Sequence, residues 1–119
     1  MLLWAAGDAV DPEAWKRVEL ADAVYVSAAS VWEIEIKRST GRLPAPADLA
    51  ERALQEGFVA LPITFEHARL AGRLPPVHRD PFDRMLVAQA QAEGMMLATA
   101  DAALGAYGVP LLSVSRAAQ

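Results

Sequence analysis

Three acidic residues stand near the starts of three separate predicted helices. Glu33 and Asp101 each follow a short apolar segment, and Asp83 lies in the first turn of a third helix. Carboxylates brought together would repel and raise one another's pKa unless a cation lay between them. Oxygen ligands and the absence of cysteine favour Mg²⁺ or Mn²⁺ over zinc. A metal held by carboxylates activates water and offsets phosphate charge, so the pattern indicates phosphodiester cleavage.

Each acid also fits a purely structural role. Ser30 and Glu33 have the spacing of a capping box, and Asp80 suits the N-cap of a helix that carries Asp83 in its first turn. Asp101 could cap the helix that follows it. Acids favour helix N-termini in general, so capping stays open as the alternative for each acid taken alone. The metal interpretation depends on the three acids converging.

The elements that would position these acids alternate between short apolar strands and helices of about ten residues. Strands are predicted over residues 23–27, 58–63, 95–99 and 109–114, and helices after Asp11 and over residues 28–38, 47–56, 64–74, 80–94 and 101–104. This order predicts a single α/β domain over residues 1–119, with a mostly parallel sheet and helices on both faces. Ligands of such sheets lie outside the carboxyl ends of the strands, where the three acids fall.

Composition excludes several classes of protein. The 119 residues are 54% hydrophobic and 22% charged, with no cysteine and a net charge of −4. These values exclude disorder, a disulfide scaffold and a thiolate-bound metal, and they argue against a protein that coats duplex DNA. No apolar run approaches the ~18 residues of a membrane span, so no membrane association and a cytoplasmic location are expected. The chain also has no glycine-rich phosphate loop and no G-x-S-x-G motif.

Four basic residues are candidates for binding a phosphate-containing substrate. Lys37 could contact phosphate, or it could pair with Glu33 four residues earlier on the same helix. His78 lies in a loop and could reach a substrate phosphate or simply lie on the surface. Arg79 and Arg84 in the same segment are further candidates.

The aromatic residues and the second histidine have less specific interpretations. Trp4, Trp15 and Trp32 could stack on bases of single-stranded RNA. Packing in the core or against a partner is the favoured use for all three, because Trp4 and Trp32 lie in apolar segments. His67, inside a predicted helix, is expected to be an exposed or half-buried structural residue.

Several segments, taken in order, resemble PIN-domain toxins of the VapC type. The third and fourth motifs of that family are matched by residues 78–90 (HRDPFDRMLVAQA) and 97–101 (LATAD). The second motif is matched by residues 27–37 (SAASVWEIEIK), the middle strand-to-helix segment by 61–64 and 67–68, and the lead into the last strand by 107–110. The resemblance covers nearly the whole chain at ordinary spacings.

This resemblance implies a three-layer PIN-like fold and an Mg²⁺- or Mn²⁺-dependent endoribonuclease. Such toxins cut RNA, often tRNA or rRNA, and stop translation. They are usually homodimers and are neutralised by a VapB-type antitoxin. By motif, Glu33, Asp83 and Asp101 match the catalytic, metal-coordinating acids, and Ser30, Asp80 and Thr99 match positions near the site.

The start of the chain departs from the family pattern. The family opens with a strand that ends in an Asp, and residues 1–4 (MLLW) resemble only the tail of that motif. The first, central strand and its Asp are therefore expected to be missing, so the domain would be N-terminally incomplete. A mis-assigned start would explain this, and neither Asp8 nor Asp11 is expected to replace the acid. The loss would weaken metal binding and leave two unpaired inner strand edges.

Two other functions follow from these observations. A catalytically inactive PIN-domain remnant could still bind the antitoxin through its apolar helices. A phosphotransfer receiver shares the fold class, but it needs a lysine near its end, and no lysine follows Lys37.

Overall fold

A computed structural model describes residues 2–4, 23–42 and 47–113 of the chain. Its five strands form one parallel sheet in the order β3-β2-β1-β4-β5. The strands are β1 (Leu2–Trp4), β2 (Val24–Ser27), β3 (Val59–Leu61), β4 (Met96–Thr99) and β5 (Leu111–Ser113). The helices are α2 (Ala28–Ser39), α3 (Leu49–Gln55), α4 (Phe65–Arg73), α5 (Pro81–Glu93) and the 3₁₀-helix η1 (Ala102–Tyr107). The predicted three-layer α/β fold is confirmed.

The prediction that the first strand is missing is wrong. Leu2–Trp4 forms β1 at the centre of the sheet, parallel to β2 on one side and to β4 on the other. Three apolar residues suffice because both neighbouring strands supply backbone hydrogen bonds, so no inner edge is left unpaired. β1 itself contains no acid. Asp8 and Asp11 lie outside the described residues, as do the helix predicted after Asp11 and Trp15.

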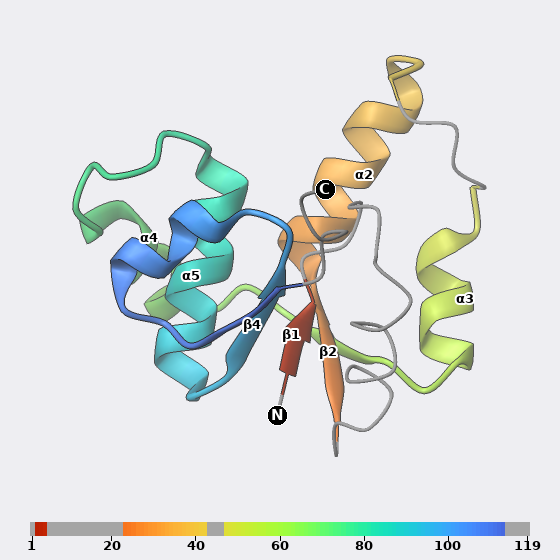
Figure 1. Cartoon of the computed structure of the whole chain (residues 1–119). Coiled ribbons are helices and arrows are strands. Elements are labelled where there is room, and N and C mark those ends of the chain that lie inside the picture. The colour runs from red at the N-terminus through yellow and green to blue at the C-terminus, as the bar shows by residue number, and fades with distance from the viewer. Residues whose placement is uncertain (1, 5–22, 43–46, 114–119) are drawn as a thin grey trace, which may run out of the picture.

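Alternation along the strands divides the apolar residues between the two faces of the sheet. Leu3 pairs with Leu97 on β4, and both are fully buried in the core that α5 covers with Leu86 and Val87. Trp4, the next residue along β1, lies on the other face, towards α2 and α3. Figure 1 shows α4 and α5 side by side and α3 at the far side of the molecule. The sheet is therefore covered on both faces, as a parallel sheet requires.

Caps fix where the two helices next to the third motif begin and end. Thr64 caps α4 in a capping box with His67, and Asp80 caps α5 by accepting from the Phe82 N–H at 2.8 Å. Pro81 follows at the first helical position, where it removes no hydrogen bond. Gly94 ends α5 with a left-handed φ of 66°. These boundaries agree with the predicted ones.

A buried chain of polar side chains connects α5 to the ends of β2 and β3. Ser27 donates to Oε1 of Gln89 at 2.5 Å, and the Gln89 amide lies 3.3 Å from Nδ1 of His67. His67 is 1% exposed and its Nε2 lies 2.9 Å from Glu93. The expectation that His67 is exposed or half-buried is wrong, because the capping box turns its ring inward. Among the described helices, none is long and apolar enough to cross a membrane.

Leu97→Ala is expected to lower the free energy of unfolding by about 2–5 kcal/mol, because it opens a cavity in the central core. Leu97 is 0% exposed, whereas its neighbour Met96 is 40% exposed. Met96→Ala is the matched control and should cost less than about 1 kcal/mol. Urea denaturation followed by circular dichroism measures both. Equal losses would contradict the assigned faces of β4.

Candidate functional site

The carboxyl ends of β2 and β4 bring the predicted acids to one edge of the sheet. α2, which carries Glu33, begins directly after β2, and Asp101 stands two residues beyond the end of β4. The first turn of α5 brings Asp83 to the same place (Figure 1). Parallel topology was predicted to bring the three acids together. It does so for Asp83 and Asp101, whose ligand atoms lie within 4.8 Å of each other, but Glu33 does not belong to this cluster.

Glu33 does not belong to a capping box. Ser27 caps α2 through its side-chain oxygen, which accepts from the Ala29 N–H at 3.0 Å. Ser30 is therefore already inside the helix and fully buried, and its hydroxyl has no hydrogen-bond partner among the described residues. Glu33 pairs instead with Lys37 at 3.1 Å. The capping alternative is thus excluded for Glu33, and the ion pair suggested for Lys37 is confirmed.

Asp101 caps a helix with one carboxylate oxygen and faces the cluster with the other. Its Oδ1 accepts from the Ala103 N–H at 3.0 Å, and its backbone N–H donates to the buried Thr99 hydroxyl at 3.1 Å. Its Oδ2 lies 3.0 Å from Nε2 of His78. Thr99 therefore orients the segment that carries Asp101.

His78 joins the two aspartates. Its Nε2 lies 3.0 Å from Asp101 Oδ2 and 3.6 Å from Asp83 Oδ2, and the ligand atoms of the three side chains lie within 4.8 Å of one another. The interpretation of His78 as a surface residue is therefore wrong. The loop turns its ring inward because Asp80 N–H donates to Nδ1 at 3.2 Å.

Electrostatics distinguish Asp83 from the other acids. Its pKa is raised from 3.8 to about 6, mainly by burial and also by the charges of Asp80, Glu33 and Asp101, while His78 lowers it. Glu33 is not among the three side chains whose ligand atoms meet, although its charge contributes to the shift at Asp83. A cation placed beside Asp83 would relieve the repulsion.

The donor set fits a hard divalent cation. Ligands of one Mg²⁺ ion, each at about 2.0–2.1 Å, lie at most roughly 4.2 Å apart. One carboxylate oxygen of Asp83 and one of Asp101 lie within 4.8 Å of each other, so a small movement would bring both to one ion. Oxygen donors suit Mg²⁺ or Mn²⁺, whereas an imidazole ligand would also admit softer metals.

The predicted cationic residues have different surroundings. Arg84 donates to four backbone carbonyls, two through each terminal nitrogen, at 2.9–3.3 Å. These carbonyls belong to Ala71, Leu74, Pro75 and His78. Arg84 therefore orders the segment between α4 and α5 rather than facing solvent. Arg79 is exposed.

An aromatic pair borders the acids. Trp32, which precedes Glu33, packs edge-to-face on Phe82, which precedes Asp83, with ring centroids 5.2 Å apart. Trp32 is nevertheless 61% exposed. It is not a core residue, so of the interpretations given to it, base stacking and partner contact remain.

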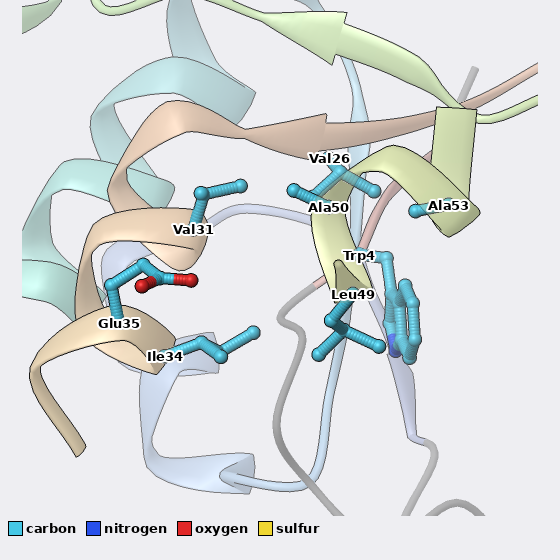
Figure 2. Close-up of a pocket in the computed structure, with 8 residues that line it drawn as sticks. All are labelled: Trp4, Val26, Val31, Ile34, Glu35, Leu49, Ala50 and Ala53. Atoms are coloured by element: carbon cyan, nitrogen blue, oxygen red, sulfur yellow. The ribbon is translucent and has the colours of Figure 1, made fainter. Parts of the chain in front are cut away.

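The structure also contains an apolar pocket between α2 and α3. Trp4, Val26 and Ile34 line it, and Figure 2 shows Glu35 as the one charged side chain drawn there. Glu35 pairs with Arg38 at 3.2 Å. The pocket contains none of the predicted acids and lacks the groups needed for phosphodiester chemistry.

The sequence did not predict the role of Tyr107, and it predicted His78 only as a possible phosphate contact. Tyr107 accepts from the His78 backbone N–H at 2.8 Å and donates to the Pro75 carbonyl at 3.1 Å. Nothing in the spacing connects it to a histidine 29 residues away. The role of His78 had a local signal, since it stands two residues before the N-cap Asp80, within reach of that residue's N–H.

Comparisons with known proteins agree with this geometry. A family model described as PIN domain matches residues 1–109. The chain is similar to the crystal structure of FitAcB from Neisseria gonorrhoeae, with 18% identity, TM-score 0.63, and 95% of this chain and 97% of that chain covered. It is also similar to FitAB bound to an IR36 DNA fragment, with 15% identity, TM-score 0.65, and coverage of 99% and 100%.

A toxin–antitoxin complex from Klebsiella pneumoniae has 15% identity and TM-score 0.64, with 95% of this chain and 97% of that chain covered. No curated protein sequence matches the chain. At these identities the structural matches show a shared fold.

Because the pKa of Asp83 is raised, replacing its carboxylate by a neutral side chain should increase the free energy of unfolding in a pH-dependent way. The charged form of Asp83 is disfavoured in the folded state. The charged carboxylate therefore lowers the free energy of unfolding above about pH 6, whereas below its ordinary pKa of 3.8 the carboxyl is protonated in both states and has no such effect. In metal-free buffer, Asp83→Asn should raise the free energy of unfolding above that pH by on the order of 2 kcal/mol.

Denaturation curves across this pH range, with Asp48→Asn as control, measure the effect. Asp48 is an exposed acid on another segment, paired with Arg52. The gain should vanish as the pH approaches 3.8. If Asp83→Asn raised the free energy of unfolding equally at every pH, the raised pKa of Asp83 would be contradicted.

Proposed function

The chain belongs to the PIN-domain family, and on that premise we propose that it is an Mg²⁺- or Mn²⁺-dependent endoribonuclease toxin neutralised by a cognate antitoxin. PIN domains are generally metal-dependent nucleases. The observation that carries the proposal is the meeting of the Asp83 and Asp101 side chains, whose ligand atoms lie within 4.8 Å of each other beside His78. A fold that only needed helix caps would not bring two carboxylate oxygens this close together.

In this proposal each residue of the site has its own role. A bound divalent cation would activate a water molecule and offset charge on the scissile phosphate. Asp83 and Asp101 would hold the cation through their Oδ2 atoms, and Glu33 would accept a hydrogen bond from the attacking water. The water oxygen would bond to phosphorus as its proton passes towards Glu33, one P–O ester bond would break, and the leaving oxygen would take up a proton from solvent. Asp80 and Thr99 order the segments that carry Asp83 and Asp101, and Ser30 lies one turn before Glu33 on α2. Lys37 and the exposed Arg79 are the proposed contacts for backbone phosphates.

The proposed partners follow from the fold. Solved structures with this fold include FitAB and a toxin–antitoxin complex, which supports an antitoxin of the VapB type as the partner. We further propose a homodimer, as in the VapC-type toxins that the sequence resembles. Cleavage of RNA, with translation as the process inhibited, rests on the same resemblance.

Cleavage tests the proposal directly. The chain should cut a total RNA pool in the presence of Mn²⁺, and Asp83→Asn should reduce the rate at least about 100-fold, because several kcal/mol of charge stabilisation is lost. Asp48→Asn is the matched control and should cleave normally. If the folded protein binds Mn²⁺ but does not cleave RNA, the alternative stands, and the protein is an inactive antitoxin-binding module.

The exposed aromatic pair predicts a contact with the substrate. We expect Trp32→Ala to weaken binding of a hydrolysis-resistant single-stranded RNA about 5- to 150-fold, the 1–3 kcal/mol typical of a base stacked on an aromatic ring. Fluorescence anisotropy of a labelled oligonucleotide measures this. Phe65→Ala, at a residue on α4 that is 89% exposed, is the control and should leave binding unchanged.

Sedimentation of the same variants separates the two uses of Trp32. If Trp32→Ala leaves RNA binding intact but changes the oligomeric state or antitoxin binding, the residue belongs to a protein interface instead.

A further inference from the structure

Hydrogen bonds to Asp80, two residues later in the chain, and to Tyr107 of η1 hold His78 in one orientation. Its backbone N–H donates to the Tyr107 hydroxyl at 2.8 Å, and Tyr107 is itself bonded to the Pro75 carbonyl. Its ring accepts the Asp80 N–H on Nδ1 at 3.2 Å and meets Asp101 Oδ2 through Nε2 at 3.0 Å. A flipped ring would place carbon atoms at both partners and lose both bonds.

This arrangement determines which ring nitrogen carries the proton. A backbone N–H can only donate, so Nδ1 must present its lone pair to Asp80. The neutral imidazole then carries its proton on Nε2, which donates it to Asp101. Asp80 cannot turn away, because its side chain caps α5 and its position fixes the first turn of that helix.

A histidine that binds a metal has the opposite arrangement. It offers the lone pair of one nitrogen to the ion and donates the proton on the other nitrogen to an acceptor. If Nε2 of His78 bound a metal, the proton would move to Nδ1 and face the Asp80 N–H, so two donors would oppose each other. This orientation therefore suits an Nε2–H that donates a hydrogen bond to Asp101.

We propose that His78 is a positioning residue, which fixes the Asp101 carboxylate through its Nε2–H and does not itself bind the metal. The inference rests on the proposed function, in which Asp83 and Asp101 hold Mg²⁺ or Mn²⁺. With Ala103 N–H on Oδ1 and His78 on Oδ2, both oxygens of Asp101 are held before any ion arrives. The ion then meets oxygen donors from the protein, which suits Mg²⁺ over softer metals.

The first test observes the proton on the wild-type protein. Two-bond ¹⁵N–¹H spectra of the imidazoles, in alkaline buffer, should show His78 with its proton on Nε2, both metal-free and saturated with Mg²⁺. The chain has only two histidines, so the loss of one signal set in His78→Gln assigns them. His67 is an internal reference, because its Nδ1 accepts the Thr64 N–H and its Nε2 meets Glu93. A proton on Nδ1 of His78, in either state, overturns the proposal.

The second test measures Mg²⁺ affinity by titration calorimetry. His78→Ala should weaken binding about 10- to 100-fold, as the loss of a residue that orients a ligand does. His78→Gln, which can return an N–H near the position of Nε2, should recover most of that loss. Recovery supports positioning when the first test also shows the His78 proton on Nε2 in the Mg²⁺-saturated wild type, because that proton leaves Nε2 no lone pair for the ion. Equal losses in both variants overturn it.

The two tests keep this inference separate from the proposed function. If wild type binds Mg²⁺ and the His78 proton moves to Nδ1, only the positioning role fails and a metal-dependent nuclease stands. If wild type binds neither Mg²⁺ nor Mn²⁺, the proposed function fails, and the positioning role falls with it.

Discussion

The repulsion between Asp83 and Asp101 is the interaction that the surrounding structure must overcome. Their ligand atoms lie within 4.8 Å of each other and of His78. Burial is the main cause that raises the pKa of Asp83 to about 6, and the charge of Asp101 adds to it. A parallel sheet creates this situation, because every strand delivers its carboxyl end to the same edge. Elements on both sides of the site have to be held firmly enough that the repulsion does not separate them.

The structure meets that demand by giving each acid a second attachment. Asp101 uses one oxygen to cap η1 and leaves the other for the cluster. Asp83 lies in the first turn of α5, and the Asp80 cap fixes where that helix begins. Capping and a role at the site are therefore not competing explanations at Asp101, since one carboxylate has lone pairs for both. The helix termini also favour negative charge, which offsets part of the repulsion.

Local patterns predicted most of the fold, and topology placed most of the site. Apolar runs and caps located every described strand except β1, and the Asp80-Pro81 pair set the start of α5. β1 was missed because residues 1–4 resemble only the tail of the family's first motif, whereas pairing with β2 and β4 makes this segment a strand. His78 was underestimated for a similar reason, because its partner Asp101 is 23 residues away. Propensity describes neighbours in sequence, whereas these features depend on contacts between distant segments.

The cations around the acids are largely occupied by the protein itself. Lys37 pairs with Glu33, and Arg84 binds the carbonyls of the segment before α5. The chain as a whole carries a net charge of −4. A polyanionic substrate therefore finds little free positive charge at the described site, although phosphate contacts normally supply much of the affinity for nucleic acids. A divalent cation bound between Asp83 and Asp101 would neutralise the charge of the two carboxylates. On the proposed function, metal binding would therefore lower the electrostatic cost of bringing a phosphate to this site.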